Sequence, residues 1–353
     1  MADKPLRVGL LGYGIAGAVF HAPLIASTPG LTLDAVVMSN PERQAQVQKA
    51  CPDAAVVDRA FALWEREPDL VVVATPNRTH VPLALAALDA GIPVVVDKPF
   101  APTADEGRRL VERARSLGLF LTVFQNRRWD ADFLTVRRLL DEGALGTVTR
   151  FESRYERWRP NLRDNWRELA GADEAGGLLF DLGSHLIDQA LHLLGPVTSV
   201  YGELDRRRAG SAVDDDAFVA LTHASGVRSH LWANTLAAQL GPRFRILGDR
   251  AGFTKYGMDV QEDALRAGGR PGDPRWGEEP PSQWGRLGAD GSSSDVPSVP
   301  GAYQEFYAGV VAALRDGAPP PVDPLDAVAA LEIIDAARRS ALEGRVVHLD
   351  APA

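Results

Sequence analysis

The chain has 353 residues, a formal net charge of −9 and one cysteine, Cys51. Its length predicts about two domains, and a hydrophobic fraction of 45% is ordinary for a globular protein. The negative charge argues against a general nucleic-acid binder, and no apolar run reaches the roughly 18 residues of a membrane span. A single cysteine excludes an internal disulfide and a cysteine-ligated zinc site. The N-terminal segment does not resemble a signal peptide, so we expect a cytoplasmic protein.

The first 125 residues alternate short apolar segments with helical patterns. Predicted strands cover residues 7–12, 33–39, 70–75, 93–99 and 119–125. A helix is predicted at 103–118, with Thr103 as N-cap, Glu106 completing a capping box and Gly118 as C-cap. Valine-rich strands separated by helices are typical of a parallel sheet covered on both faces. Residues 1–125 are therefore predicted to form a doubly wound α/β domain.

Residues 126–353 follow a different pattern. An alternating strand at 146–158 lies between predicted helices at 130–142 and 178–191. Further strand-like segments come without helices between them, at 198–208, 216–224, 227–235 and 243–249. They predict an α+β domain with a mostly antiparallel sheet that has one open face. The stretch 266–300 is rich in Gly, Pro and Ser and is predicted to be a surface excursion. Two closing helices are predicted at 302–316 and 325–343.

The motif GYGIAG follows the first strand and opens a helix. In that setting the GxGxxG spacing indicates dinucleotide binding. Gly12 allows a tight turn, Gly14 lets a pyrophosphate approach the backbone, and Gly17 lets the helix and strand pack closely. The helix N-terminus then favours the phosphate charge. The residues predicted to bind the cofactor here are Gly12, Tyr13, Gly14, Ile15, Ala16 and Gly17.

The end of the second strand lacks the acid that NAD-selective sites carry about 20 residues beyond the glycine loop. Asp34 lies too early, and the strand end holds Ser39 and Asn40. These two side chains could hydrogen-bond a 2′-phosphate, and Arg43 could reach it from the following helix turn. We therefore expect NADP to be preferred over NAD. The alternative is that Arg43 is a solvated helix residue and either cofactor binds.

The apolar helix at 178–191 is interrupted by Asp181 and His185, which stand four residues apart and share one face. A histidine near its ordinary pKa suits proton transfer at neutral pH. Taken alone, such a pair is most often a structural hydrogen bond. Asp188 and His192 continue the face, but ligands strung over roughly 16 Å of one helix cannot surround an ion. We therefore predict no metal site and interpret these two residues as packing groups.

Five motifs occur in a fixed order: GYGIAG, ATPNRTH (74–80), VVVDKPF (94–100), FQNRRWD (124–130) and GGLLFDLGSHLIDQAL (176–191). Together they resemble the glucose–fructose oxidoreductase/inositol dehydrogenase/rhizopine catabolism (Gfo/Idh/MocA) family over essentially the whole chain. The nearest resemblance is to its bacterial scyllo-inositol dehydrogenase branch, through HAPLI (21–25) and KYG (255–257). The resemblance implies a Rossmann domain followed by an open-faced mixed-sheet domain.

The resemblance also implies a catalytic triad of Lys98, Asp181 and His185. Lys98 matches the lysine of the family's E-K-P motif, with Asp97 as a shorter carboxylate in place of glutamate, which leaves the orientation of the lysine open. Asp181 and His185 match the D-x-G-x-H pair. His185 would take the hydroxyl proton, Lys98 would donate to the reacting oxygen, and Asp181 would orient a substrate hydroxyl or hold the imidazole. Further cofactor contacts are expected from Thr75, Pro76, Asn77, His80, Asp97, Lys98, Asn126 and Arg127.

An aromatic- and arginine-rich stretch after the strand at 146–158 is the candidate substrate region. Its members Tyr155, Trp158, Arg163 and Trp166 suit a polyol, and equally an oligomer contact. The predicted function is hydride transfer between NADP and a cyclic polyol or sugar, with scyllo-inositol and its ketone first. The alternatives are another sugar, or a cofactor-sensing regulator without catalysis. Because monomers rarely leave apolar sheet area wet, we expect a homodimer or homotetramer formed through the open sheet.

Overall fold

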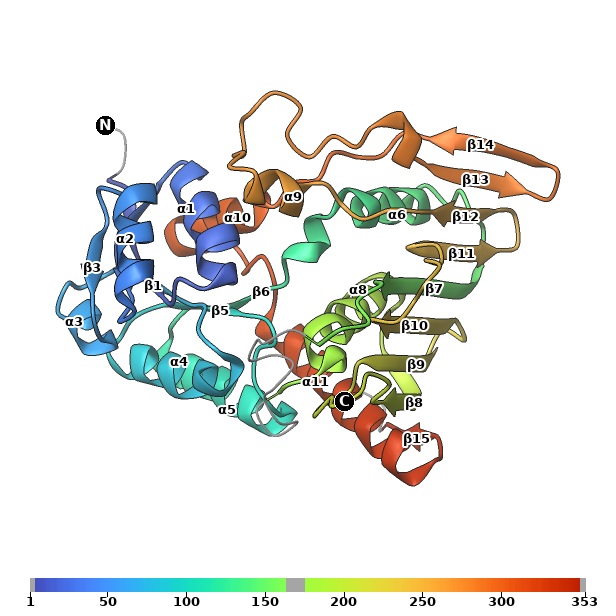
Figure 1. Ribbon diagram of the computed structural model, residues 1–353, viewed down its shortest axis with the longest axis horizontal. Coiled ribbons are helices and arrows are strands. Elements are labelled where there is room, and N and C mark those ends of the chain that lie inside the picture. Colours follow the sequence, from blue (N-terminus) through green and yellow to red (C-terminus); the bar gives the residue numbers. More distant parts are fainter. Residues whose placement is uncertain (1–3, 163–174, 350–353) are drawn as a thin grey trace.

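The computed structural model describes residues 4–162 and 175–349, which form two sheets with a group of helices between them (Figure 1). The first sheet has six parallel strands in the order β3-β2-β1-β4-β5-β6. This is the Rossmann order, in which ligands bind where the strand order reverses, at the carboxyl ends of the strands. The strands are β1 Leu6–Leu11, β2 Leu31–Val37, β3 Ala55–Val57, β4 Leu70–Val73, β5 Val94–Asp97 and β6 Leu121–Phe124.

Helices cover both faces of this sheet, as the valine-rich strands predict. The strands β4, β5 and β6 are accordingly buried along their whole length. The Thr103 hydroxyl accepts from the Glu106 N–H, and Gly118 has a left-handed φ of 65°, so both predicted caps of α5 are confirmed. The helical elements are η1 Ala16–His21, α1 Ala22–Ser27, α2 Pro41–Ala50, α3 Ala60–Trp64, η2 Asn77–Thr79, α4 His80–Asp89 and α5 Ala104–Leu117.

The second sheet has nine strands in the order β14-β13-β12-β11-β7-β10-β9-β8-β15. Only the β7–β10 pair is parallel among these strands, so the prediction of a mostly antiparallel sheet is confirmed. The strands are β7 Val148–Glu156, β8 Val197–Asp205, β9 Asp216–His223, β10 Arg228–Asn234, β11 Phe244–Gly248, β12 Gly252–Lys255, β13 Gly285–Ala289, β14 Ser292–Val296 and β15 Val347–His348.

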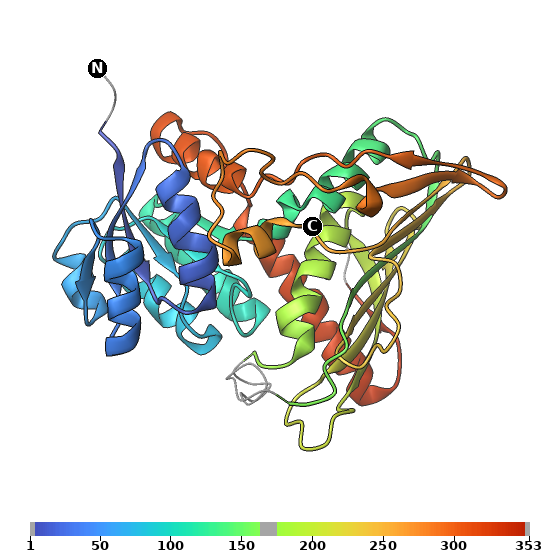
Figure 2. The same ribbon diagram turned by 45° about the horizontal axis from the view of Figure 1, so that its top comes forward.

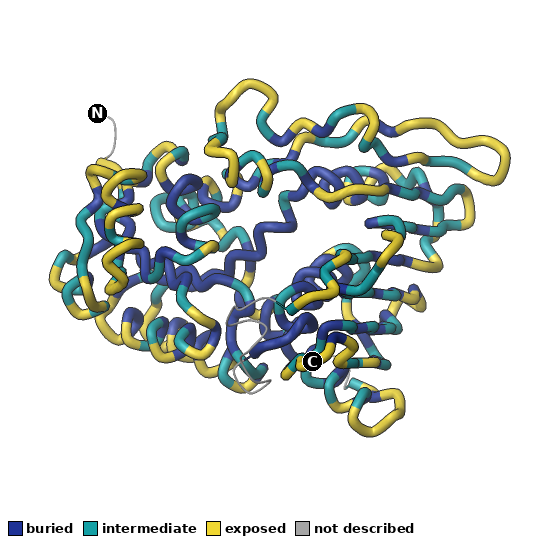
Figure 3. Tube along the Cα trace, in the orientation of Figure 1, coloured by how far each residue is buried: buried dark blue, intermediate teal, exposed yellow. Residues whose placement is uncertain are grey.

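One face of the second sheet is covered by helices that lie between it and the Rossmann sheet. Figure 2 shows α8 and α11 in this middle layer, and α11 also packs against α5 of the first half. Buried residues follow this middle layer and the parallel sheet (Figure 3). The remaining helical elements are η3 Asn126–Trp129, α6 Ala131–Asp141, η5 Leu179–Gly183, α8 Ser184–Leu194, α9 Gln261–Arg266, η6 Pro281–Gln283, α10 Gln304–Asp316 and α11 Pro324–Glu343. None of the helices in the described ranges is long and apolar enough to cross a bilayer.

Two sequence predictions need correction. The predicted surface excursion at 266–300 contains the antiparallel hairpin β13–β14, which extends the sheet beyond β12. The predicted single helix at 178–191 begins instead with the π-helical turn η5, and the α-helix α8 starts only at Ser184. π-Helical turns are rare and often lie at functional sites.

No helix of residues 4–162 and 175–349 covers the other face of the second sheet, which is lined by partly buried aromatic side chains. Burial alternates strictly along β9, as expected for a strand with one covered face. On the open face, the ring of Phe218 lies 5.2 Å from that of Trp232 and 5.8 Å from that of His230. The Arg154 guanidinium stacks 3.9 Å from the Trp232 ring centre. The uncovered face is therefore an apolar patch bordered by charge.

Candidate active site

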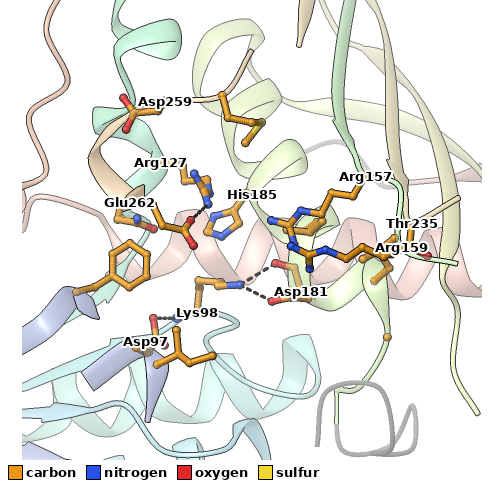
Figure 4. Close-up of a pocket in the computed structure, with 18 of the residues that line it drawn as sticks. Asp97, Lys98, Arg127, Arg157, Arg159, Asp181, His185, Thr235, Asp259 and Glu262 are labelled. Carbon is orange, nitrogen blue, oxygen red and sulfur yellow. Dashed lines mark hydrogen bonds and ion pairs between the residues drawn. The ribbon is translucent and has the colours of Figure 1, made fainter. Parts of the chain in front are cut away.

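A cavity of about 650 Å³ lies between the two halves, at the carboxyl ends of β5 and β6. Lys98 and Asp97 enter it from the Rossmann side, Asp181 and His185 from η5 and α8, and Arg127 from η3 (Figure 4). The three residues predicted to be catalytic thus line one cavity, although Lys98 is separated by more than eighty positions from the others in the sequence. The position agrees with the general rule for ligand sites in open α/β sheets.

Lys98 is held by Asp181 through two hydrogen bonds. Its Nζ donates to the Asp181 Oδ1 at 2.9 Å and to the backbone carbonyl oxygen of the same residue at 2.7 Å. The lysine side chain is 14% exposed and the aspartate side chain 28%, so the pair is reachable from the cavity but sheltered from bulk water. The π-helical turn places both acceptors of Asp181 on the lysine. We conclude that Asp181 orients the Lys98 ammonium group.

His185 is buried and carries no positive charge at neutral pH. Burial, together with the nearby cations Lys98, Arg127, Arg243 and Arg157, holds the pKa of His185 well below its ordinary value. The expectation of a nearly ordinary pKa for His185 is therefore wrong, because the prediction included neither the burial of the ring nor the arginines that distant segments bring near it. The Nδ1 atom of His185 has no hydrogen-bond partner among the described residues, so Asp181 does not hold the imidazole. A neutral ring that lines the cavity is suited to accept a proton.

The backbone of Lys98 rests on a buried chain of polar groups. The Asp97 Oδ1 accepts from the Lys98 N–H at 2.9 Å and lies 3.7 Å from the His21 Nε2. The His21 Nδ1 lies 2.6 Å from the hydroxyl of Tyr307, and burial raises the pKa of that phenol well above its usual value. The protonated hydroxyl can donate to Nδ1, which puts the ring proton on Nε2, facing Asp97. Burial raises the pKa of Asp97, but His21, Lys98 and His80 outweigh it and lower that pKa overall.

The glycine loop has the shape that a dinucleotide needs. Gly12 has a φ of 95°, and a Cβ there would lie 2.7 Å from the Ala74 carbonyl oxygen. A Cβ on Gly17 would lie 2.2 Å from the Gly12 carbonyl oxygen. At Gly14 only the Arg43 guanidinium would come close, at 3.3 Å, so the backbone there is open to a phosphate. The residues present therefore fit a nicotinamide dinucleotide.

The polar residues after β2 have separate tasks. The Asn40 side chain caps α2 by accepting from the Arg43 N–H at 3.0 Å. The Arg43 Nη1 donates to the Tyr13 carbonyl oxygen at 3.3 Å, which places an exposed cation over the glycine loop, and Ser39 is exposed as well. Asp34 is bound by Arg7 at 3.1 Å and by Arg66 at 2.9 Å, away from the strand end. The predicted ribose position therefore adjoins the Arg43 guanidinium and not the Asp34 carboxylate.

The loop after β4 is anchored by buried side chains. The ring nitrogens of His80 lie 2.9 Å from the Pro99 carbonyl oxygen and 2.8 Å from that of Thr75. The Asn77 amide donates to the Ala175 carbonyl oxygen at 2.9 Å. His80 and Asn77 thus join this loop, which carries Thr75 and Pro76, to neighbouring segments, and neither lines the cavity. Of the other predicted cofactor residues, the cavity lining includes Ile15, Ala16, Asp97, Lys98, Asn126 and Arg127.

The predicted substrate residues lie elsewhere. Tyr155 is buried beneath the cavity, where its hydroxyl accepts from the Arg243 Nη2 at 2.8 Å. Trp158 is 57% exposed and does not line the cavity. Arg163 and Trp166 lie outside the described residues. Among the described residues of this stretch, Arg157 and Arg159 line the cavity, and neither was predicted to bind substrate.

Asp188 and His192 serve packing, as the sequence suggested. The Asp188 carboxylate forms a two-pronged ion pair with Arg128, with contacts of 2.9 Å and 2.6 Å, and both side chains are almost fully buried. The His192 ring lies 5.9 Å from the ring of Phe133 on α6. These contacts fix α8 against η3 and α6, and thereby fix the helix that carries His185.

Comparisons with known proteins agree with the fold and the site. Residues 6–125 match the family described as "Oxidoreductase family, NAD-binding Rossmann fold", and residues 137–349 match "Oxidoreductase family, C-terminal alpha/beta domain". The chain is 37% identical to scyllo-inositol 2-dehydrogenase (NADP(+)) IolW of Bacillus subtilis, over 98% of this chain and 96% of the relative. It is 42% identical to the oxidoreductase YdgJ of Escherichia coli, over 97% of both chains.

Solved structures show the same likeness. The yvaA oxidoreductase of Bacillus subtilis superimposes with a TM-score of 0.93 at 36% identity, covering 98% of this chain and 99% of that one. The YPO2259 oxidoreductase of Yersinia pestis has a TM-score of 0.91 at 40% identity, with 99% of both chains covered. The chain therefore belongs to the glucose–fructose oxidoreductase/inositol dehydrogenase/rhizopine catabolism family of NAD-binding oxidoreductases.

Proposed function

We propose that the protein transfers hydride between a secondary alcohol of a cyclic polyol or sugar and NADP, with scyllo-inositol and its ketone as the first substrate pair. The observation that carries the proposal is the Lys98–Asp181–His185 group in one cavity beside the glycine-loop domain. The name of the relative IolW supports both the substrate and the cofactor. A second relative, the D-glucoside 3-dehydrogenase of Escherichia coli, is 30% identical over 74% of this chain and favours another sugar as the alternative.

In this mechanism the protein binds the alcohol oxygen and removes its proton. Lys98, held by Asp181, donates a hydrogen bond to the reacting oxygen and stabilises negative charge that develops there. His185 accepts the hydroxyl proton and returns it in the reductive direction. Gly12 and Gly17 shape the loop, Gly14 leaves room for the pyrophosphate, and Arg43 would bind the 2′-phosphate. The nicotinamide, when bound, supplies the hydride acceptor.

The test of the substrate class is a panel of inositols and monosaccharides, each assayed with NAD and with NADP for formation of the reduced nicotinamide. Turnover of scyllo-inositol, mainly with NADP, supports the proposal in full. Turnover of a different sugar supports the alternative enzyme. Tight cofactor binding without turnover of any compound would favour the cofactor-sensing regulator. A cytoplasmic location stays a prediction.

Cofactor preference is expected to depend on Arg43. An exposed arginine that pairs with a phosphate contributes a charge-assisted hydrogen bond, so Arg43→Ala should raise the Kd for NADP about tenfold and leave that for NAD little changed. Calorimetric titration of both cofactors measures the ratio. Arg59→Ala, which removes another exposed arginine of the same domain, is the matched control. An equal rise in the Kd for NADP and for NAD would show that Arg43 does not bind the 2′-phosphate.

We also propose a homo-oligomer formed through the open sheet face, because Phe218, His230 and Trp232 form an uncovered aromatic cluster there. Sedimentation should give a dimer or tetramer for the wild type and a shift towards monomer for Phe218→Glu, which places a charge in the interface opposite Glu203 of the neighbouring strand. Phe61→Glu, at an exposed phenylalanine of the Rossmann domain, should leave the assembly unchanged. A monomeric wild type at micromolar concentration would overturn this proposal.

A further inference from the structure

The cavity wall on the side of the second sheet is built by two arginines. Arg157 and Arg159 follow directly after β7, and their backbone N–H groups donate to the carbonyl oxygens of Asn234 at 2.8 Å and Thr235 at 2.7 Å. The backbone at these positions is therefore fixed. Figure 4 shows both side chains reaching toward Asp181 and His185 from the side opposite to Asp97. A ligand held by Lys98 and His185 would meet these guanidinium groups on the side that faces the second sheet.

Most of the other cations in the cavity are paired with carboxylates. Lys98 binds Asp181, Arg127 binds Glu262 at 2.8 Å, and Arg208 binds Asp215 at 2.9 Å. Arg157 differs, because no side chain within 4–162 and 175–349 forms an ion pair or hydrogen bond with its guanidinium group. The residue is partly buried and its charge is permanent. A partly desolvated cation without a counter-ion has a cost in folding stability that a bound anion would offset.

The acids on the same wall do not supply that counter-ion. The Asp214 Oδ2 accepts from the Leu179 N–H at 2.7 Å, facing η5. The Asp215 carboxylate accepts from the Arg208 side chain and from the backbone N–H of Arg207 at 2.7 Å. Both carboxylates are therefore engaged, Asp214 by the backbone of η5 and Asp215 by Arg207 and Arg208 of its own loop. At Arg157 the wall presents positive charge to the ligand.

We propose that the physiological substrate carries an anionic oxygen group, a carboxylate or a phosphate monoester, which Arg157 binds on the side of the cavity that faces the second sheet. This inference rests on the proposed function and makes it more specific: the substrate is a sugar acid or a phosphorylated polyol. Guanidinium groups bind both kinds of anion through two parallel hydrogen bonds, with more geometric specificity than a neutral hydroxyl allows. The neutral polyol is then a partial substrate that fills only the reacting half of the cavity.

The test compares matched neutral and anionic compounds in the full-length protein with NADP. The pairs are glucose with glucuronate, glucose with glucose 6-phosphate, and myo-inositol with an inositol monophosphate. We expect a higher kcat/KM for the anionic member of at least one pair, and its identity distinguishes carboxylate from phosphate. Arg157→Gln should lower that kcat/KM at least tenfold, mainly through KM, and change the neutral compound little. Arg150→Gln, at an exposed position near the start of β7, the strand that leads to Arg157, is the matched control.

Two results would overturn the inference while leaving the proposed function intact. One is turnover of neutral compounds with a kcat/KM equal to or above that of every anionic partner. The other is an Arg157→Gln variant that loses neutral and anionic turnover alike. If no compound turns over, calorimetric binding of glucuronate and glucose 6-phosphate to the cofactor complex decides. Tighter binding of an anionic compound than of glucose, with loss of this difference in Arg157→Gln, supports the anionic substrate. Equal binding of the anionic compounds and glucose refutes it.

Discussion

Replacing Lys98 with methionine is expected to lower kcat for alcohol oxidation by about 10²–10³-fold, the usual effect of removing a hydrogen-bond donor aimed at a developing oxyanion. Methionine fills much of the lysine's volume, and the lost ammonium group is hydrogen-bonded only to Asp181 among the described residues. Cofactor affinity should change little, because the glycine loop and Arg43 are untouched. Stopped-flow formation of the reduced nicotinamide, with a separate titration of NADP, measures both quantities.

The matched control for Lys98 is Lys49→Met, which removes an exposed lysine from the last turn of α2. This variant should keep the wild-type kcat. Asp181→Asn should reduce kcat less than Lys98→Met, since the amide oxygen and the backbone carbonyl can still accept from the lysine. A Lys98→Met enzyme with nearly normal kcat would show that the lysine is not aimed at the reacting oxygen.

His185→Gln is expected to lower kcat/KM for oxidation by about 10²–10⁴-fold, the usual contribution of a positioned general base. The pKa of His185 is lowered by burial and by four nearby cations, so the ring stays neutral as the pH falls through 6.5. Wild-type kcat/KM should therefore remain constant down to that pH and decline only at lower values, where the imidazole becomes protonated. A pH–rate profile extending below 6.5 measures the position of this decline.

The variant should lose that acidic decline, which distinguishes loss of the base from a general disturbance of the fold. His192→Gln, two turns further along the same helix, removes a histidine that packs on Phe133 and should keep the profile. An acidic decline centred above pH 6.5 in the wild type, or one that survives in His185→Gln, would assign the proton to another group.

The sequence predicted the elements whose pattern is local. Continuous valine strands, the glycine spacing and the caps at Thr103 and Gly118 each follow from residues close together in the chain. The strand β3 was missed because it is a three-residue edge strand, and the hairpin β13–β14 because its strands are rich in Gly, Ser and Asp and carry few β-branched or aromatic residues. In the fold, β3 is stabilised by pairing with β2, and β13 by pairing with β12.

The site was predicted in part for the same reason. Lys98, Asp181 and His185 were predicted from motifs. The pairing of Asp181 with Lys98 depends on a π-helical turn that no residue pattern predicted. His21 and Tyr307 are 286 positions apart, and only the packing of α10 on the Rossmann domain brings them together. At the end of β7 the aromatic residues were predicted to contact the substrate, whereas the fold buries Tyr155 and directs Arg157 into the cavity.

Direct hydride transfer from the ring carbon of a polyol is the central claim, and isotope transfer tests it most directly. Scyllo-inositol deuterated at its ring carbons is incubated with the enzyme and NADP, and the reduced cofactor is analysed by mass spectrometry and NMR. We predict one deuterium per reduced nicotinamide, with loss of the labelled product in Lys98→Met and His185→Gln. Reduced cofactor without deuterium, or no reduction with this or any other deuterated polyol or sugar, would contradict the account.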